Sequence, residues 1–193
     1  MEKTLLAGIE TESNDTECAQ VEAAIGGDAR AFAALYDRHL DRVYSYVYYW
    51  VRNKADTEDL TQQVFLNAWR AIGSYRRTKA SFISWLLRIA HNLVMSFYRK
   101  TKEAPCLDVE PVSIERWADP EAEVFAKLDG QAVRIAILRL KREQQEVVVM
   151  RFLQGLDYSE IAAALGKSEG NIRVIQYRAL TELRRLLAHE VNV

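Results

Sequence analysis

The residues best suited to chemistry lie in one short stretch, LGKSEGNIRVIQYRAL, which runs from Leu165 to Leu180. A Gly-Lys-Ser turn opens this stretch, and arginines follow among aliphatic side chains. Between positions 167 and 187 the basic residues Lys167, Arg173, Arg178, Arg184 and Arg185 are opposed only by Glu169 and Glu182. Cations on one side of a helix attract phosphates, and the side chains between them can reach base edges. The pattern therefore indicates a helix that binds nucleic acid.

A second helix must hold such a helix at an angle, and the preceding residues predict one. Asp157 followed by Glu160 forms a capping box for YSEIAAAL, and Gly166 then ends that helix. Ala162, Gly166 and Ile172 have the spacing of a helix-turn-helix, in which a small side chain and a glycine let the two helices cross closely. Ser168 is expected to cap the second helix.

The spacing of apolar residues in this second helix predicts which side is buried and which side is exposed. The residues expected in the core are Ile161, Leu165, Ile172, Ile175, Ala179, Leu183 and Leu186. The front and flanks are left to Asn171, Arg173, Val174, Tyr177 and Arg178. An amphipathic packing helix with a solvated basic side is the alternative, since most charged helix faces are of that kind.

Composition favours helices and provides enough apolar residues for a core. The 193 residues are 49% hydrophobic and include only 8 Gly and 3 Pro. Cys18 and Cys106 form no paired pattern, which favours two free thiols in a reducing compartment. No signal-like or membrane-spanning run occurs, so we expect a soluble, cytoplasmic protein. The net charge of −1 means that any attraction to nucleic acid must come from local asymmetry.

The three prolines divide the chain. Pro105, Pro111 and Pro120 all fall in EAPCLDVEPVSIERWADP, which predicts an irregular connection. A connection of this length is typical of a linker between domains. We therefore expect an all-α protein with two small helical domains joined by a flexible linker. The predicted parts are an acidic extension (1–27), an N-terminal domain (28–102), the linker (103–120) and a helix-turn-helix domain (121–193).

Three helices are predicted in the N-terminal domain. Asp28 is expected to cap the first, Asp56 the second (in ADTEDLTQQVFLNAWRAIGSY) and Ser81 the third (SFISWLLRIAHNLVMSFYRK). Trp69 and Trp85 follow the apolar phase of the last two helices and are predicted to be core residues rather than base-stacking ones. A polar, basic loop, GSYRRTKA, lies between these two helices.

Two motifs in this order resemble one protein family. DTEDLTQQVFLNAWRAIGSY with FISWLLRIAHNLVMSFYRK is similar to the −10 recognition domain of extracytoplasmic-function (ECF) sigma factors. QQEVVVMRFLQGLDYSEIAAALGKSEGNIRVIQYRALTELRRLL resembles their −35 recognition domain. The resemblance covers roughly residues 29–102 and 121–188. It implies an RNA polymerase subunit that directs promoter recognition, DNA melting and transcription initiation, without catalysis of its own and without a cofactor, metal or small-molecule substrate.

The resemblance assigns residues to three surfaces. Core polymerase would be bound by Asp59, Leu60, Gln62, Gln63 and Phe65. The −10 element would be held by Tyr75, Arg76, Arg77, Lys79, Trp85, Arg88, His91, Asn92, Arg99 and Lys100. The −35 element would be read by Lys167, Ser168, Glu169, Gly170, Asn171, Arg173, Val174, Tyr177 and Arg178.

The chemistry of these residues fits the implied roles. Capture of an unstacked base needs an aromatic or apolar pocket with cations for the backbone, and the GSYRRTKA loop offers both. Polar residues beside an apolar stripe suit helix-to-helix docking, although without the resemblance an ordinary solvated face would be the favoured interpretation. The expected partners are core RNA polymerase, promoter DNA and an anti-sigma factor. A stand-alone helix-turn-helix regulator and an all-helical protein adaptor remain as alternatives; familiar enzyme motifs are absent from the sequence.

Overall fold

The structure, a computed structural model, describes residues 15–76, 81–101 and 130–190. All regular elements within these ranges are helical, so the predicted all-α class is confirmed. The N-terminal domain contains α2 (Ala29–Val51), α3 (Lys54–Ala71), a 3-10 turn (Ile72–Ser74) and α4 (Phe82–Thr101). The C-terminal domain contains α6 (Gly130–Leu138), α7 (Arg142–Val148), the π-helical segment η2 (Val149–Leu153), α8 (Tyr158–Leu165) and α9 (Glu169–Glu190). The predicted linker over 103–120 lies outside the described residues.

The N-terminal domain is a bundle in which α2, α3 and α4 all pack against one another. Asp28 begins α2 as predicted, since its side chain accepts hydrogen bonds from the backbone N–H groups of Arg30 and Ala31. Residues 15–25 form another helix, which buries Val21 and Ala24 in the domain core. The acidic segment before α2 therefore contributes apolar contacts to this domain.

A salt bridge holds this N-terminal helix to α2. Glu17 lies 3.4 Å from the guanidinium of Arg38 and 3.5 Å from the ring of the buried His39. Burial alone would raise the pKa of Glu17, but hydrogen bonds and charge from His39 and Arg38 outweigh it and lower that pKa. Glu17 is thus held in its ionised form at the junction of the two helices.

The cap of α3 differs from the prediction. Asn53, not Asp56, is the N-cap: the Asn53 Oδ1 accepts a hydrogen bond of 3.0 Å from the backbone N–H of Asp56. Asp56 instead lies in the first turn, where a carboxylate is favourable for the helix dipole. Ser81 precedes α4 as predicted, but its hydroxyl has no hydrogen-bond partner among the described residues.

The C-terminal domain is built around α9, which packs on α6, α7 and α8. The Asp157–Glu160 capping box of α8 is confirmed, with each side chain bonded to the other's backbone N–H at 2.8 Å. Gly166 ends α8 with a φ of +66°, a left-handed conformation that costs a glycine little. The helix-turn-helix geometry predicted from Ala162, Gly166 and Ile172 follows, with Ala162 and Ile172 both buried.

Replacing Asp157 with Ala should lower the free energy of unfolding by ~1 kcal/mol, because the capping box is lost. Burial would raise the Asp157 pKa, but hydrogen bonds from Glu160 and Ser159 outweigh it and lower that pKa. The stabilisation should therefore be present above the ordinary carboxylate pKa of about 4 and disappear as the pH falls below it. Urea unfolding followed by circular dichroism at pH 7 and pH 3 measures both effects. Asp41→Ala, at an exposed position in α2, is the control and should change stability by less than about 0.5 kcal/mol.

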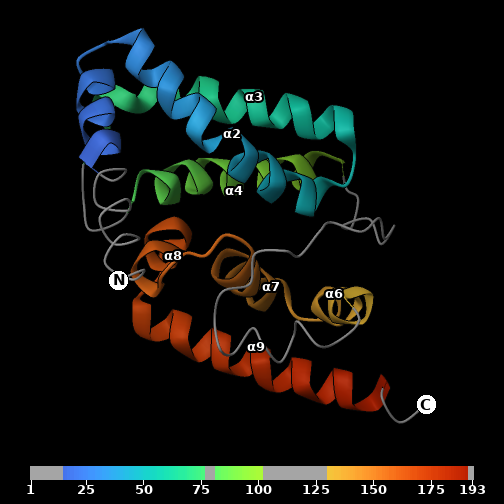
Figure 1. Cartoon of the computed structure of the whole chain (residues 1–193). Coiled ribbons are helices and arrows are strands. Elements are labelled where there is room, and N and C mark those ends of the chain that lie inside the picture. Colours follow the sequence, from blue (N-terminus) through green and yellow to red (C-terminus); the bar gives the residue numbers. More distant parts are fainter. Residues whose placement is uncertain (1–14, 77–80, 102–129, 191–193) are drawn as a thin grey trace, which may run out of the picture.

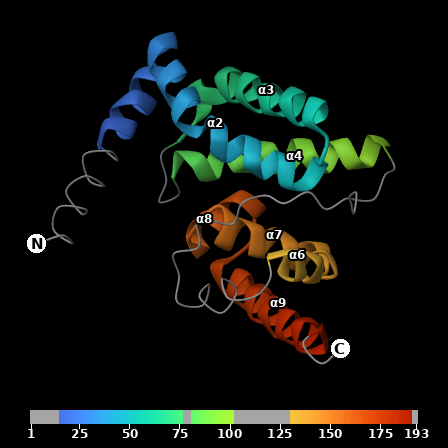
Figure 2. The ribbon, with the colours of Figure 1, turned by 45° about the vertical axis from the view of Figure 1, so that its right-hand side comes forward.

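The two domains lie against each other through α4 and α8. Figures 1 and 2 show α4 between the α2–α3 pair and the C-terminal domain, with α9 on the far side. Helix α9 therefore forms an outer surface of the molecule. None of the helices in the described ranges is long and apolar enough to cross a membrane.

Candidate nucleic-acid interface

The first half of α9 presents an exposed front. Ser168 caps the helix as predicted, its hydroxyl accepting from the backbone N–H of Asn171 at 3.3 Å. Ile172 and Ile175 are buried on the rear side, which fixes the rotation of the helix. Val174 is 46% exposed and Tyr177 is 71% exposed, so neither side chain packs in the core of the domain. The predicted −35 residues lie at or around this front: Lys167 is half-buried, and Ser168, Glu169, Gly170, Asn171, Arg173 and Arg178 are exposed.

The basic side chains of this surface differ in how many neighbouring groups they contact. The ammonium of Lys167 lies 2.5 Å from the Glu143 carboxylate. The guanidinium of Arg173 is 4.1 Å from the centre of the Tyr158 ring and 3.9 Å from the Glu169 carboxylate. These contacts fix Arg173 in place before any ligand arrives.

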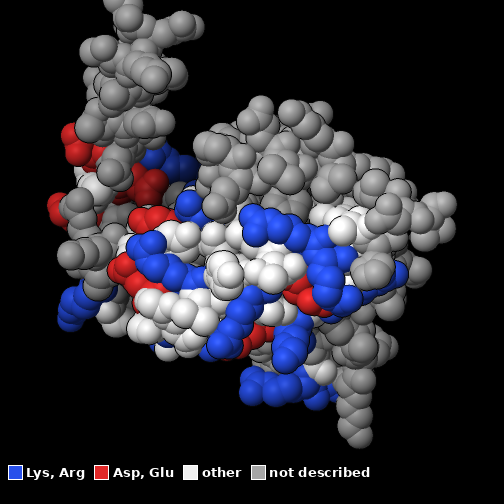
Figure 3. Space-filling model, turned by 90° about the horizontal axis from the view of Figure 1, so that it is seen from below, with Lys and Arg blue, Asp and Glu red and all other residues white. Residues whose placement is uncertain are grey.

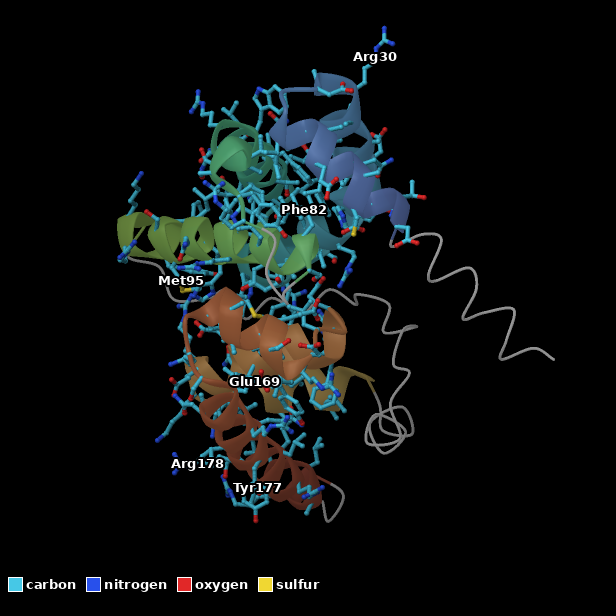
Figure 4. All side chains as sticks on the ribbon, turned by 90° about the vertical axis from the view of Figure 1, so that its left-hand side faces the viewer. Arg30, Phe82, Met95, Glu169, Tyr177 and Arg178 are labelled. Atoms are coloured by element: carbon cyan, nitrogen blue, oxygen red, sulfur yellow. The ribbon has the colours of Figure 1, made fainter. Side chains whose placement is uncertain are left out.

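Arg178, by contrast, extends outward from α9 beside Tyr177 (Figure 4). Seen along the outer side of α9, Lys and Arg side chains outnumber Asp and Glu over the visible described surface (Figure 3). Arg184 and Arg185 continue the exposed basic set along the helix, although Arg185 is paired with Glu182 at 2.6 Å. A cationic strip with an apolar centre is suited to the phosphates and base edges of a major groove.

A second exposed surface lies on α3. Asp59, Gln62 and Gln63 are exposed, as docking on a partner requires. Leu60 and Phe65 are 6% and 4% exposed, so both pack in the core and are not on the docking surface. The predicted set was wrong on these two residues.

The exposed apolar side chains on α3 are Leu66 and Trp69, which the sequence did not assign to a docking surface. Leu66 is 48% exposed, and Trp69 is 37% exposed with its ring 4.9 Å from that of Phe32. The prediction of Trp69 as a core residue was therefore wrong. Together with Asp59, Gln62 and Gln63, these two residues form what we call the α3 face.

The predicted −10 residues occupy different environments. Tyr75 is only 8% exposed and packs against Phe82 and Trp85, with ring centres 5.6 and 4.9 Å away. Its ring is therefore not open to a base in this conformation. Trp85 is half-buried, which agrees with its predicted packing role. Arg76 is exposed, and Arg77 and Lys79 lie outside the described residues.

The exposed polar residues of α4 share one side of the helix. Arg88, Asn92 and Arg99 are spaced by four and seven residues and are all exposed, followed by the exposed Lys100. The half-buried Trp85 lies one turn before Arg88 on the same side. This arrangement provides a cationic track that could follow a single-strand backbone.

His91 faces a different direction from that track. The Nδ1 of His91 lies 3.3 Å from the hydroxyl of Tyr46, inside the N-terminal bundle. Burial, and then the positive charge of Arg142 in the C-terminal domain, lower the His91 pKa from 6.5 to about 4. The ring is therefore neutral at pH 7 and lies at the contact between the domains.

Titration of His91 by NMR should give a midpoint near pH 4 in the whole chain. Arg142→Ala should raise that midpoint towards 6.5, because the cation is removed and the ring gains access to water. Arg30→Ala removes an exposed arginine at the opposite end of the N-terminal domain (Figure 4) and should leave the midpoint unchanged. A His91 midpoint of 6.5 in the unsubstituted chain would contradict this placement.

Comparison with protein-family models gives two matches in the order that the motifs predict. Residues 35–104 match "Sigma-70 region 2" and residues 136–185 match "Sigma-70, region 4". The first range includes α3 and α4, and the second includes the helix-turn-helix. The α3 face and the exposed side of α4 thus lie in the first matched region, and the front of α9 lies in the second.

The two relatives reported next are both described as ECF RNA polymerase sigma factors. The chain is 43% identical over 178 residues to the "ECF RNA polymerase sigma factor BldN" of Streptomyces coelicolor, covering 89% of this chain and 66% of that relative. It is 34% identical over 181 residues to the "ECF RNA polymerase sigma factor SigM" of Mycobacterium tuberculosis, covering 92% of this chain and 87% of that relative.

Solved structures share the fold. CnrH, in complex with the cytosolic domain of CnrY, matches with a TM-score of 0.66 at 24% identity, covering 90% of this chain and 98% of that one. The sigma factor RpoE of Bartonella quintana, in complex with the anti-sigma factor NepR, matches with a TM-score of 0.60 at 22% identity, covering 83% and 98%. At this identity the matches establish a common fold.

Proposed function

Because the chain belongs to the extracytoplasmic-function sigma factors of the sigma-70 family, we propose that it binds core RNA polymerase in the cytoplasm and directs initiation at its promoters. In this proposal the α3 face docks on polymerase, the exposed track on α4 holds the −10 element, and the front of α9 reads the −35 element. The protein itself carries out no catalysis; its contribution is binding and positioning.

The observation that carries the proposal is the exposure of Tyr177 at the centre of α9. A tyrosine that is 71% exposed between arginines contributes nothing to the core of its own domain. Its position on the second helix of a helix-turn-helix is where side chains meet base edges. Val174, one turn earlier, adds a branched apolar group suited to a thymine methyl.

Transcription from a promoter library tests the proposal. The purified chain is mixed with core RNA polymerase and the library, and the 5′ ends of the transcripts are mapped. We expect initiation from a defined subset of templates that share elements at −10 and −35. Equal transcription with and without the chain would refute the function. Tight dimeric binding to an operator without polymerase would instead favour a stand-alone regulator.

An anti-sigma factor is the further partner in this proposal. Leu66 and Trp69 leave apolar surface on the domain that would bind polymerase, so an inhibitor covering them would compete directly. Affinity purification from the native cell tests this: an inhibitor and core polymerase should be recovered in separate complexes, and recovery of both with one chain would contradict competition for the α3 face.

A further inference from the structure

One aromatic ring lies beside two arginines in the helix-turn-helix domain. The centre of the Tyr158 ring is 4.1 Å from the guanidinium carbon of Arg173, on α9, and 5.1 Å from that of Arg151, in η2. Both distances are within the range of a cation–π contact, and the shorter one belongs to the residue at the front of α9. Tyr158 therefore connects the first helix of the helix-turn-helix to the exposed front of the second.

The Tyr158 ring is held in place by its own helix. Tyr158 is the first residue of α8, directly after the Asp157 cap, whose side chain accepts a hydrogen bond of 2.8 Å from the backbone N–H of Glu160. The ring is half-buried and packs against the domain core. Because its backbone is capped and its ring is packed, Tyr158 offers a fixed surface, whereas the long Arg173 side chain has many rotamers to lose.

Arg151 is positioned independently of this ring. Its Nη1 donates a hydrogen bond of 3.0 Å to the backbone carbonyl of Leu156. Arg151 lies in the π-helical segment η2, and π-helical turns are rare and occur frequently at functional sites. Arg173 is the more exposed of the two arginines, so its direction depends more strongly on the ring. The charge of Arg151 adds to the positive potential in which Arg173 would meet a phosphate.

Glu169 is the competing neighbour of Arg173. Its carboxylate lies 3.9 Å from the guanidinium, one turn earlier on α9, and both side chains are more than half exposed. Such a pair is weakly held in water, but a guanidinium drawn fully onto the carboxylate would present less charge and fewer N–H donors to DNA. An aromatic face attracts the cation without accepting its N–H groups as a carboxylate does. Contact with Tyr158 therefore keeps Arg173 available to a ligand.

We propose that Tyr158 is a positioning residue for −35 recognition. Its ring holds the guanidinium of Arg173 across the α8–α9 turn, in the orientation that meets DNA and not closed on Glu169. This inference rests on the proposed function, because it concerns how the front of α9 engages the −35 element. It adds a residue on the first helix that acts through Arg173. The benefit is preorganisation, since less side-chain entropy is lost when DNA binds.

Proton NMR of the whole chain tests the contact without DNA. The ring current of Tyr158 should shift the Hδ and Hε signals of Arg173 upfield. Tyr158→Leu should abolish this shift and Tyr158→Phe should keep it, because the ring and not the hydroxyl makes the contact. Signals of Arg184, an exposed arginine farther along α9, should be the same in all three chains. Unshifted Arg173 signals in the unsubstituted chain would overturn the inference.

Transcription on paired templates with and without the −35 sequence measures the consequence. Tyr158→Leu should lower the −35-dependent part by ~2- to 5-fold, the effect of losing one partly exposed cation–π contact. Tyr158→Phe should restore it. Tyr44→Leu removes a half-buried tyrosine from α2 and should leave it unchanged. A Tyr158→Phe chain as defective as the Tyr158→Leu chain would overturn the role of the ring.

A double-mutant cycle with Arg173 distinguishes positioning from support of the fold. In an Arg173→Ala chain, Tyr158→Leu should cause no further loss of −35-dependent transcription, because no guanidinium is left to position. A further loss as large as in the chain with Arg173 would overturn the inference. An unsubstituted chain that initiates equally well without the −35 sequence would overturn the −35 assignment in the proposed function instead, and the NMR shift would still decide whether the contact exists.

Discussion

Replacing Leu66 with Asp should weaken binding to core RNA polymerase by at least ~30-fold while leaving the fold intact. Leu66 is 48% exposed on α3 and lies among the exposed polar residues of the α3 face. A docked partner would bury the new carboxylate without a counter-ion, at a cost of about 2 kcal/mol or more, and this corresponds to ~30-fold in affinity. Fluorescence anisotropy of labelled protein titrated with core enzyme measures the affinity, and circular dichroism confirms the fold.

Val174→Asp is the matched control, since Val174 has nearly the same exposure but lies on α9. It should bind polymerase normally and lose transcription that depends on the −35 element. Leu60→Asp is the opposite control: Leu60 is buried, so this change should unfold the domain. If folded Leu66→Asp protein bound polymerase with unchanged affinity, the α3 face would not be the docking surface.

Arg178→Ala should reduce −35-dependent transcription by ~5- to 150-fold, the range that follows from losing a groove contact of about 1–3 kcal/mol. Arg178 projects outward from α9, whereas Arg173 already has the Tyr158 ring and Glu169 as neighbours. Removal of Arg173 should therefore also loosen the α8–α9 turn. Transcription on paired templates with and without the −35 sequence, together with polymerase affinity, measures the effect.

The outcome of this comparison locates the role of Arg178. The Arg178→Ala chain should bind core polymerase as tightly as the unsubstituted chain and behave like it on templates that lack the −35 sequence. Loss of polymerase binding would place Arg178 on a protein interface. An equal decrease on both templates would exclude a sequence-dependent contact.

Local signals predicted much of the fold. The Asp157–Glu160 box, the Gly166 turn and the Ser168 cap are each set by residues within four positions of one another, and all three are confirmed. Asn53 was missed because Asp56, three residues later, is also a favourable residue at the start of a helix. The N-cap is the residue at which the backbone leaves the helical conformation, and two polar candidates within one turn leave its position open.

Sequence was less informative about the exact rotation of α3. Apolar residues occur at 60, 64, 65, 66, 68 and 69, so two helix phases fit them almost equally well. A shift of one residue turns a side chain by about 100°, enough to exchange the buried Phe65 with the exposed Leu66. The contact between the domains was not predicted at all, because residues such as Arg42 and Gln154, which share a hydrogen bond across it, are 112 positions apart and such pairs leave no periodic pattern.

The length of α9 couples promoter choice to distant parts of its domain. Its 22 residues form a rod of ~33 Å: the first half carries the residues proposed to read DNA, and in the second half Leu183 and Leu187 are buried where α9 packs on α6 and α7. A lever of that length converts a tilt of ~5° at the anchored end into a displacement of ~3 Å at the other, close to the rise of one base pair. Repacking around Leu187 should therefore change base preference in a promoter library although no DNA-facing residue is altered. Substitutions in the core of this domain should therefore change promoter specificity without altering any DNA-facing side chain.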